Sequence, residues 1–441
     1  GLPTDERTGD FVRVIREDPK QKGLLVCGTE TTVYVSFDDG DQWQSLRLNL
    51  PTTSIRDMTF HTGDHMNDLV IGTYGRSFWV LDDMSPLREV ATHAQGIASA
   101  PAYLFKPGDA IRARQNINWD TPFPPEVPEA SNPPFGALIY YHLGQAPAGE
   151  VKLQIYDSAG SLVRTLSSVA APANQPPPPV PSYWLATPES LALPAAAGTN
   201  RAHWDLRYDD PPAVSHDIEN QMFALPHQTT YGPHGPLALP GTYTVKLTAG
   251  GQTYSQPLVV RNDPRIGESP AILAALRSQH RLEMLAYQAM KDSYAGNAAV
   301  AALRAQVLPL TENSAIAGAA HALQAKLTTF GGTTGGGRGG RGRGGAPAPG
   351  ALVAFSQLNA GFSSLISPVT RDMAATQPQI QAWEGYCQEY NRTVTAWNGV
   401  QSQDVAGFNS LLRQNGLQPL TVEATKLGDP SCRFAAPAAG K

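Results

Sequence analysis

Charged residues, cysteines and long apolar runs are all scarce in this chain of 441 residues. Charged side chains make up only 16% of it and the net charge is −5, so no strong field attracts it to nucleic acid or to an anionic membrane. It contains no run of about 20 apolar residues, which argues against membrane insertion. The first residues, GLPTDERTGD, lack the basic start and apolar core of a signal peptide, so we expect any secretion signal to have been removed earlier.

Only three cysteines are present, and they match neither a CxxC pair nor the spacing of a zinc site. Cys387 and Cys432 lie in the last fifth of the chain, where a disulfide between them is one of two open alternatives. Cys27 lies far away inside an apolar run and is expected to be a buried thiol. No cofactor site is predicted.

Hydrophobic residues make up 41% of the sequence, which is enough for several buried cores. A chain of this length has room for about three domains of roughly 150 residues each. We therefore expect a multidomain protein that is mainly β with a helical part.

An internal repeat organises the start of the chain. LLVCGTETTVYVSFDD (24–39) aligns without gaps on DLVIGTYGRSFWVLDD (68–83), and a period of roughly 40 to 45 residues is typical of β-propeller blades. Short apolar and β-branched runs predict strands at 11–16, 24–28, 32–36, 43–48, 55–60, 68–73 and 77–82. Residues 1–90 are thus predicted to form the last two blades of a propeller. Two blades alone leave apolar faces and strand edges bare, so we expect further blades on a preceding segment or on a separate chain.

A second β region is predicted further along the chain. Residues 91–133 are proline-rich and are expected to form an irregular linker that begins near Met84 and contains one strand at 102–105. Alternating patterns then predict strands at 137–143, 150–157, 161–168, 200–208, 241–249 and 252–261. Their spacing is typical of an immunoglobulin-like β-sandwich over residues 134–263.

Helical periodicity replaces this pattern after Glu268. Ser269 suits a helix N-cap and Pro270 the first helical position, so residues 268–430 are predicted to form a helical bundle. The expected helices cover 270–294, 297–308, 315–328, 351–366, 377–397 and 402–415. A Gly/Arg-rich loop at 330–350 interrupts them; with three arginines and no aromatic residues among them, it is interpreted as a flexible linker rather than an RNA-binding segment.

The stretch SFDDGDQW carries a distinctive spacing: Ser36, Asp38, Gly40 and Trp43. It resembles the Asp-box, a β-hairpin turn in which Ser and Asp bond to backbone groups, Gly takes a conformation that other residues avoid, and Trp packs between strands. We interpret these four residues as structural. Calcium binding by Asp38, Asp39 and Asp41 is the alternative, although this stretch lacks the glutamate usual in an EF-hand loop.

With the Asp-box, the repeat and segments such as NRAHWDLRY and PGTYTVKL, nearly the whole chain resembles the C-terminal part of large secreted bacterial Asp-box (BNR) or sortilin-like repeat propeller proteins. Members of that family are often labelled glycosyl hydrolases. The resemblance implies a secreted or cell-surface protein in which a propeller precedes a sandwich and a helical tail. Its implied partners are the remaining blades, with a glycan or protein as ligand.

Catalysis by this chain alone is not predicted. Glycosidases need two carboxylates at a fixed separation, and sialidases need an arginine cluster beside a tyrosine. The acidic candidates are Glu17, Asp18, Glu30, Asp57, Asp82 and Asp83, and the sialidase-type candidates are Arg16, Arg56, Arg76 and Tyr74. Neither set forms a motif that fixes its geometry. The favoured function is therefore binding or assembly; the alternative is a sialidase-like or glucanase-like hydrolase with its active site mainly in the missing blades.

Two further groups of residues have alternative interpretations. His216, His227 and His234, with Asp217 and Glu219, lie in a polar loop where either a metal site or exposed histidines would fit the sequence. Trp204 is interpreted as an inward-facing residue of the sandwich rather than as part of a recognition patch. No metal-binding residue is predicted.

Overall fold

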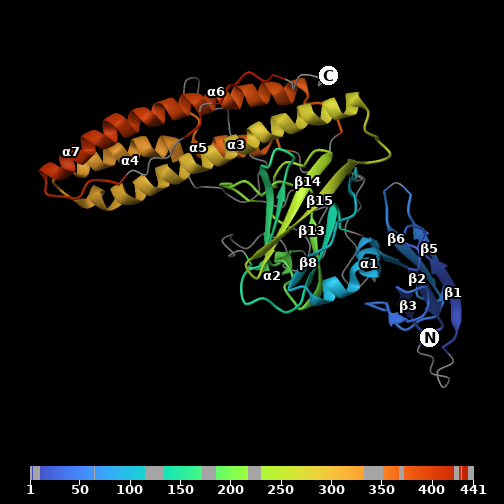
Figure 1. Ribbon diagram of the computed structural model, residues 1–441. Coiled ribbons are helices and arrows are strands. Elements are labelled where there is room, and N and C mark those ends of the chain that lie inside the picture. The colour runs from blue at the N-terminus through green and yellow to red at the C-terminus, as the bar shows by residue number, and fades with distance from the viewer. Residues whose placement is uncertain are drawn as a thin grey trace.

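The protein contains several β-sheets followed by long helices (Figure 1). The computed structural model describes residues 2, 10–63, 65–114, 134–170, 185–216, 230–331, 351–366, 372–421, 427–428 and 430–435. The chain passes from two N-terminal sheets through a central pair of sheets to a helical region that extends away from them. In the described part, no helix combines the length and apolar character needed to cross a bilayer.

Two antiparallel sheets form the N-terminal part, and they contain the seven strands that the sequence predicts. The first sheet runs in the order β1 (Val12–Glu17), β2 (Leu25–Thr29), β3 (Val33–Ser36) and β4 (Gln44–Ser45). The second runs in the order β5 (Ile55–His61), β6 (Asp68–Thr73) and β7 (Phe78–Leu81). Alternation of apolar and polar residues explains why these segments are extended and half-buried.

The two sheets are structural copies of one motif. A bulge interrupts the pairing of β1 with β2 between Val12 and Val14, opposite Gly28 and Thr29. The pairing of β5 with β6 is interrupted in the same way, opposite Gly72 and Thr73, which the repeat aligns with Gly28 and Thr29. The sheets share one hydrophobic core, which includes Val26, Val35, Met58, Leu69 and Ile71.

A helix follows the second sheet, where the sequence analysis predicted an irregular linker. Helix α1 (Ser85–Ser99) begins with Pro86 in its first turn, and Met84 and Leu87 pack into the core of the N-terminal sheets. The linker prediction was wrong for these residues because the prolines that suggested it lie outside the helix or at its start, where proline is tolerated. The predicted strand after it is present as β8 (Ala102–Leu104). Residues 115–133 lie outside the described part.

Two sheets enclose a second hydrophobic core in the middle of the chain. The first has the order β13 (Gly198–Trp204), β10 (Ala137–Leu143) and β8. The second has the order β12 (Leu162–Ser167), β11 (Lys152–Tyr156), β14 (Gly241–Ala249), β15 (Gln252–Asn262) and β9 (Ala110–Arg112). All six strands predicted for this region are confirmed, and the prediction that Trp204 faces inward is confirmed by its complete burial. A short helix, α2 (Pro188–Leu191), precedes β13.

Long helices form the last part of the described chain. They are α3 (Pro270–Val307), α4 (Ala317–Gly331), α5 (Phe355–Ser363), α6 (Gln377–Gly399) and α7 (Ala406–Gln414). A 3₁₀ turn (Leu308–Glu312) follows α3, and a π-helical segment (Val400–Val405) joins α6 to α7. The predicted N-cap is confirmed, since the Ser269 side chain accepts a hydrogen bond from the backbone N–H of Ile272.

Helix α3 is continuous, although the sequence analysis predicted two helices separated near Gly296. Here glycine allows close packing instead of ending the helix: a Cβ atom at Gly296 would lie 2.8 Å from the ring of Phe355. The helices share a core that includes Phe355, Phe362, Trp383 and Trp397. A disulfide joins Cys387 on α6 to Cys432, which resolves that alternative, and Cys27 is a buried free thiol as predicted.

Candidate functional site

The turn from Ser36 to Trp43 connects β3 to β4 and is held by its own side chains. Ser36 Oγ accepts a hydrogen bond from the Gly40 N–H (2.9 Å) and donates one to Asp38 Oδ1 (2.8 Å). Asp38 Oδ1 also accepts from the Gln42 N–H (2.9 Å), and the Trp43 indole donates to the Gly40 carbonyl (3.0 Å). The hydrogen bonds from Gln42 and Ser36 lower the pKa of Asp38. These polar atoms are therefore occupied within the turn itself.

A cavity of about 310 Å³ lies elsewhere, between the second N-terminal sheet and the central sheets. Its walls come from the segments around His65, Asp82, Asp109 and Phe135. Four aspartates line it, together with apolar side chains that include Ile111, Phe135 and Leu138. A concave, partly apolar site with a few converging polar groups at a boundary between structural parts is the usual form of a small-molecule site.

Asp82 and Asp83, at the end of β7, have perturbed protonation equilibria in this cavity. Burial raises the pKa of Asp82, and the negative charge of Asp68 raises it further, while Arg201, 3.9 Å from Asp82 Oδ2, opposes the shift. Burial also raises the pKa of Asp83, although Asp83 Oδ1 accepts a hydrogen bond from the Ser85 N–H (3.0 Å). A carboxyl group of this kind can donate a proton or a hydrogen bond at higher pH than an exposed aspartate can.

The remaining charged groups of the cavity are already paired. Asp109 Oδ2 lies 3.2 Å from His65 Nδ1 and 3.2 Å from Arg261 Nε. Asp68 accepts a hydrogen bond from the Asp83 N–H (3.2 Å), and its other carboxylate oxygen lies 3.5 Å from His61 Nδ1. In the part of the chain that the structure describes, no group of three or more His, Cys, Asp or Glu residues is arranged to hold a metal ion.

The other acidic candidates from the sequence have separate structural contacts. Asp57 pairs with Arg16 at 2.6 Å, Glu30 with Arg13 at 2.6 Å, and Asp18 with Arg88 at 2.9 Å. Glu17 accepts a hydrogen bond from the Gly23 N–H at 3.1 Å. Of the six candidates, the structure therefore brings only Asp82 and Asp83 into the cavity.

The arginines considered for a sialidase-type site have other neighbours. Arg56 stacks on the ring of Tyr74 at 4.5 Å, whereas the Arg16 guanidinium bonds to Asp57 and to the Met58 carbonyl. The carbonyl of Arg76 accepts a hydrogen bond from the Trp79 indole.

His234 of the histidine loop contacts two other side chains, and its Nε2 lies 3.2 Å from Thr230 Oγ1. His234 Nδ1 lies 3.2 Å from Asp210 Oδ1, and His216 is exposed. His227, Asp217 and Glu219 lie outside the described residues. Trp204 donates from its indole to the Arg207 carbonyl (2.9 Å) and packs edge-on against Tyr243, which suits a residue of the core.

Sequence reasoning missed Asp68, Asp109 and His65 as neighbours of Asp82 and Asp83. The aligned repeat contained a weak signal, because Asp68 in the second unit stands where the first unit has Leu24, which is buried. A polar residue at a position that is apolar in the other copy indicates that this position does not serve the hydrophobic core in both copies. Comparison with known proteins finds no matching family model, no similar curated protein and no similar solved structure.

Proposed function

We propose that this chain belongs to a secreted or cell-surface Asp-box β-propeller protein, in which it has a binding or assembly role and is not catalytic on its own. The proposal is supported by the two sheets with the same bulge and by the hydrogen-bonded turn at Ser36, Asp38, Gly40 and Trp43. The first strands of the two sheets, β1 and β5, contact each other, as the radial packing of blades requires.

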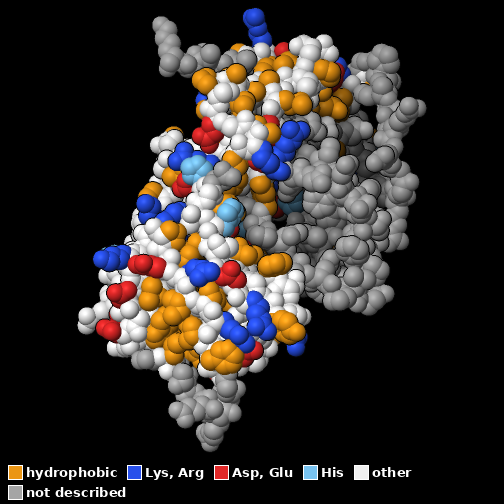
Figure 2. Space-filling model, turned by 90° about the vertical axis from the view of Figure 1, so that its right-hand side faces the viewer, with side chains coloured by type: hydrophobic (Ala, Val, Ile, Leu, Met, Phe, Trp, Pro, Cys, Tyr) orange, Lys and Arg blue, Asp and Glu red, His pale blue; other side chains and the backbone are white. Residues whose placement is uncertain are grey.

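The apolar surface of the N-terminal sheets is the observation that carries this proposal. Seven of the fourteen exposed large hydrophobic side chains among the described residues lie before Met84: Phe11, Val12, Ile15, Leu48, Tyr74, Phe78 and Val80. Figure 2 shows hydrophobic side chains gathered over this part of the molecule, beside Lys and Arg side chains. Such a concentration marks an interaction surface, and we assign it to further sheets of the same repeat, on a preceding segment or a separate chain.

The edge of the second sheet suggests how one of these contacts forms. In the first sheet, β4 pairs with Tyr34 and Val35 of β3. The repeat aligns those residues with Phe78 and Trp79 of β7, which pairs only with β6 among the described strands. Phe78 is 78% exposed. A strand supplied by the partner and paired with β7 would give the second sheet four strands, as in the first sheet, and would cover Phe78.

The central sheets support the proposed immunoglobulin-like sandwich. One sheet has three strands and the other has five, and the two sheets share one hydrophobic core. The consecutive strands β8 and β9 belong to different sheets: β8 pairs with β10 in the first, whereas β9 pairs in parallel with β15 in the second. The disulfide between Cys387 and Cys432 supports secretion, since structural disulfides persist in oxidising compartments.

Photo-crosslinking in the native protein tests this function. A photoreactive residue placed at Phe78 is expected to crosslink to another Asp-box sheet, identified by mass spectrometry and N-terminal sequencing of every chain present. The control position is Leu308 on the helical part, which is 59% exposed and outside the proposed interface. Native protein consisting of this chain alone, as a soluble monomer without such crosslinks, would contradict the proposal.

The carboxyl groups of the cavity favour a second function, glycoside hydrolysis. Asp82 and Asp83 both have raised pKa values in a partly apolar site, and glycosidases need one carboxyl group that remains protonated long enough to act as an acid. A panel of glycans incubated with native protein tests it. Cleavage that Asp82→Asn or Asp83→Asn abolishes and the exposed control Asp57→Asn leaves intact would favour this function, whereas absence of cleavage excludes it for the glycans used.

A further inference from the structure

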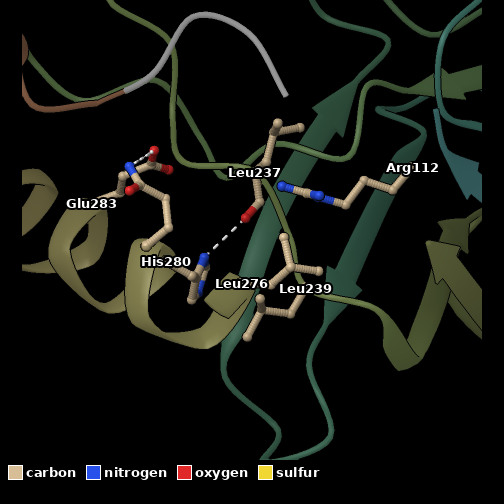
Figure 3. A pocket seen from close by; sticks show the side chains of 7 residues that line it. Arg112, Leu237, Leu239, Leu276, His280 and Glu283 are labelled. Carbon is tan, nitrogen blue, oxygen red and sulfur yellow. Dashed lines mark hydrogen bonds between the residues drawn. The ribbon is translucent and has the colours of Figure 1, made fainter. Parts of the chain in front are cut away.

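The small cavity between helix α3 and the central sheets has no room for an organic ligand (Figure 3). Its volume is about 10 Å³, which is at the lower limit for one water molecule. Three leucines help to line it, and His280 Nδ1 on α3 lies 2.9 Å from the Leu237 carbonyl. This place is therefore a packing junction between α3 and the sheets rather than a ligand site.

The two bulges of the N-terminal sheets each contain an arginine. In the first sheet, Arg13 is the residue of β1 that the pairing with β2 skips. In the second sheet, Arg56 is the residue of β5 that the pairing with β6 skips. A bulge turns a side chain away from the regular alternation of its strand, and bulges are frequent beside functional sites. Both copies of the repeat thus place a re-aimed arginine at the same position of their first strand.

Each of these arginines lies over an aromatic ring. The guanidinium carbon of Arg13 is 4.2 Å from the centre of the Phe11 ring, and that of Arg56 is 4.5 Å from the centre of the Tyr74 ring. Both rings are exposed, Phe11 at 51% and Tyr74 at 70%. Stacking on a ring orients a guanidinium without using its N–H donors. The rings therefore hold the two cations in place at the surface.

The turn beside each bulge distinguishes the two arginines. The repeat aligns Glu30, in the turn after β2, with Tyr74, in the turn after β6. Arg13 Nε donates to Glu30 Oε2 at 2.6 Å, and Ser54 Oγ donates to the same oxygen at 3.1 Å. The hydrogen bond from Arg13 lowers the pKa of Glu30, and the one from Ser54 lowers it further. The first copy thus supplies an ionised carboxylate to its own arginine.

The second copy has no carboxylate at this position, because Tyr74 stands there. Among the residues that the structure describes, Arg56 makes neither a hydrogen bond nor an ion pair. Its charge also lowers the pKa of Glu30, but that carboxylate is already bonded within the first copy. The adjacent Asp57 is paired with Arg16 at 2.6 Å. The guanidinium of Arg56 is therefore oriented, exposed and available to an anion.

The chemistry around Arg56 fits a carboxylate attached to a sugar ring. The paired N–H donors of a guanidinium match the two oxygens of a carboxylate, and the exposed ring of Tyr74 offers an apolar surface to the sugar. Arg76, exposed in the same turn as Tyr74, adds a second positive charge. A single exposed ion pair contributes little to affinity, so one isolated sugar acid would be held weakly. Useful affinity requires a polymer that carries many carboxylates.

We propose that the surface formed by Arg56, Tyr74 and Arg76 binds an acidic polysaccharide built from uronic acids, with Arg56 on a carboxylate and Tyr74 against a sugar ring. This inference rests on the proposed binding role and names its ligand. A uronic acid carries its carboxylate on a rigid ring. An acidic polypeptide carries its carboxylates on flexible side chains, whose ordering opposes binding.

Calorimetric titration of the native protein, with every chain that it contains, against polygalacturonate tests this inference. Arg56→Gln removes the charge at similar side-chain length and is expected to weaken binding about fivefold. The control is Arg413→Gln on α7, which removes another exposed arginine outside this surface and should leave the affinity unchanged. Tyr74→Ala is expected to weaken binding, whereas Tyr74→Phe keeps the ring and should not.

Matched polymers identify the ligand class. Polygalacturonate is expected to bind more tightly than neutral dextran or polyglutamate of similar length, and added salt should weaken its binding. Equal affinity for dextran, equal affinity for polyglutamate, or an unchanged affinity in Arg56→Gln would overturn the inference. Absence of polygalacturonate binding while the crosslinks from Phe78 persist would overturn this inference alone and leave the proposed assembly of Asp-box sheets intact.

Discussion

Arg88 on helix α1 donates a hydrogen bond from Nε to Asp18 Oδ2, 2.9 Å away, and connects the helix to the loop after β1. The Asp18 side chain is completely buried and that of Arg88 is 13% exposed. Arg88 also donates to Asn67 Oδ1 at 2.8 Å, so one guanidinium contacts loops from both N-terminal sheets. Helix α1 thus holds the two repeats in register with each other.

Breaking this ion pair is expected to destabilise the N-terminal sheets strongly. Asp18→Asn removes the charge that compensates a largely buried guanidinium, at a cost of roughly 3 kcal/mol in the free energy of unfolding. The matched control is Asp57→Asn, because the Asp57–Arg16 pair has side chains that are 69% and 45% exposed. That change is expected to cost less than about 1 kcal/mol. Urea denaturation measures both, and equal losses in the two variants would contradict the expectation.

Gly40→Ala tests whether the conformation of the Ser36–Trp43 turn depends on glycine. Gly40 has a φ of +95°, whereas the nearest atom to an added Cβ would be Leu25 Cδ1 at 3.5 Å, an ordinary contact. The cost, about 1–2 kcal/mol, therefore comes from the backbone and not from a clash. Gly63→Ala is the control, because Gly63 has no positive φ and no atom within 4 Å of an added Cβ. Thermal unfolding that ranks the two variants equally would argue against this explanation.

His280 is expected to make the junction between α3 and the central sheets sensitive to acid. Burial lowers the pKa of His280 to about 4, the hydrogen bond to the Leu237 carbonyl opposes this shift, and the charge of Arg112 adds to it. The unfolded chain, with an ordinary histidine pKa near 6.5, binds the proton first, so stability falls as the pH decreases from about 6.5 to about 4. The full effect amounts to about 3 kcal/mol.

The comparison of unaltered protein with His280→Asn isolates this contribution from those of other titrating groups. Denaturant unfolding at pH 7 and at pH 4.5 is expected to show a smaller loss of stability in the variant, because asparagine does not titrate. Equal losses in the two proteins would show that protonation of His280 is not responsible.

Removal of the Cys387–Cys432 disulfide is expected to lower stability by about 3–4 kcal/mol, since it closes a loop of 45 residues in the unfolded chain. Unfolding followed by circular dichroism should give the double variant Cys387→Ser, Cys432→Ser the same stability as the unaltered protein measured in the presence of reductant. Because Cys27 is buried and unpaired, reductant should have no effect on the double variant itself. A further loss on reduction would contradict the assigned pairing.

The elements of this fold were more predictable than the cavity. The N-terminal strands could be located because alternating side chains and turn residues determine them locally, as in β3 and β6. The predicted break between residues 294 and 297 was wrong because Gly296 packs against Phe355, which is distant in sequence. The cavity unites Asp82 with Asp109 and Phe135 through packing of the second sheet on the central sheets, which no local pattern encodes. The sequence allowed Asp82 and Asp83 to be named as candidates, but it did not allow the other residues that line their cavity to be predicted.

The open edge of β7 also has a consequence for handling the isolated chain. Among the strands that the structure describes, β7 pairs on one side only, so its other edge beside Phe78 offers a template to any extended polypeptide, including β7 of another molecule. Without the neighbouring sheet proposed above, the chain is expected to aggregate through this edge at high concentration. A lysine introduced on β7 is expected to keep it dispersed.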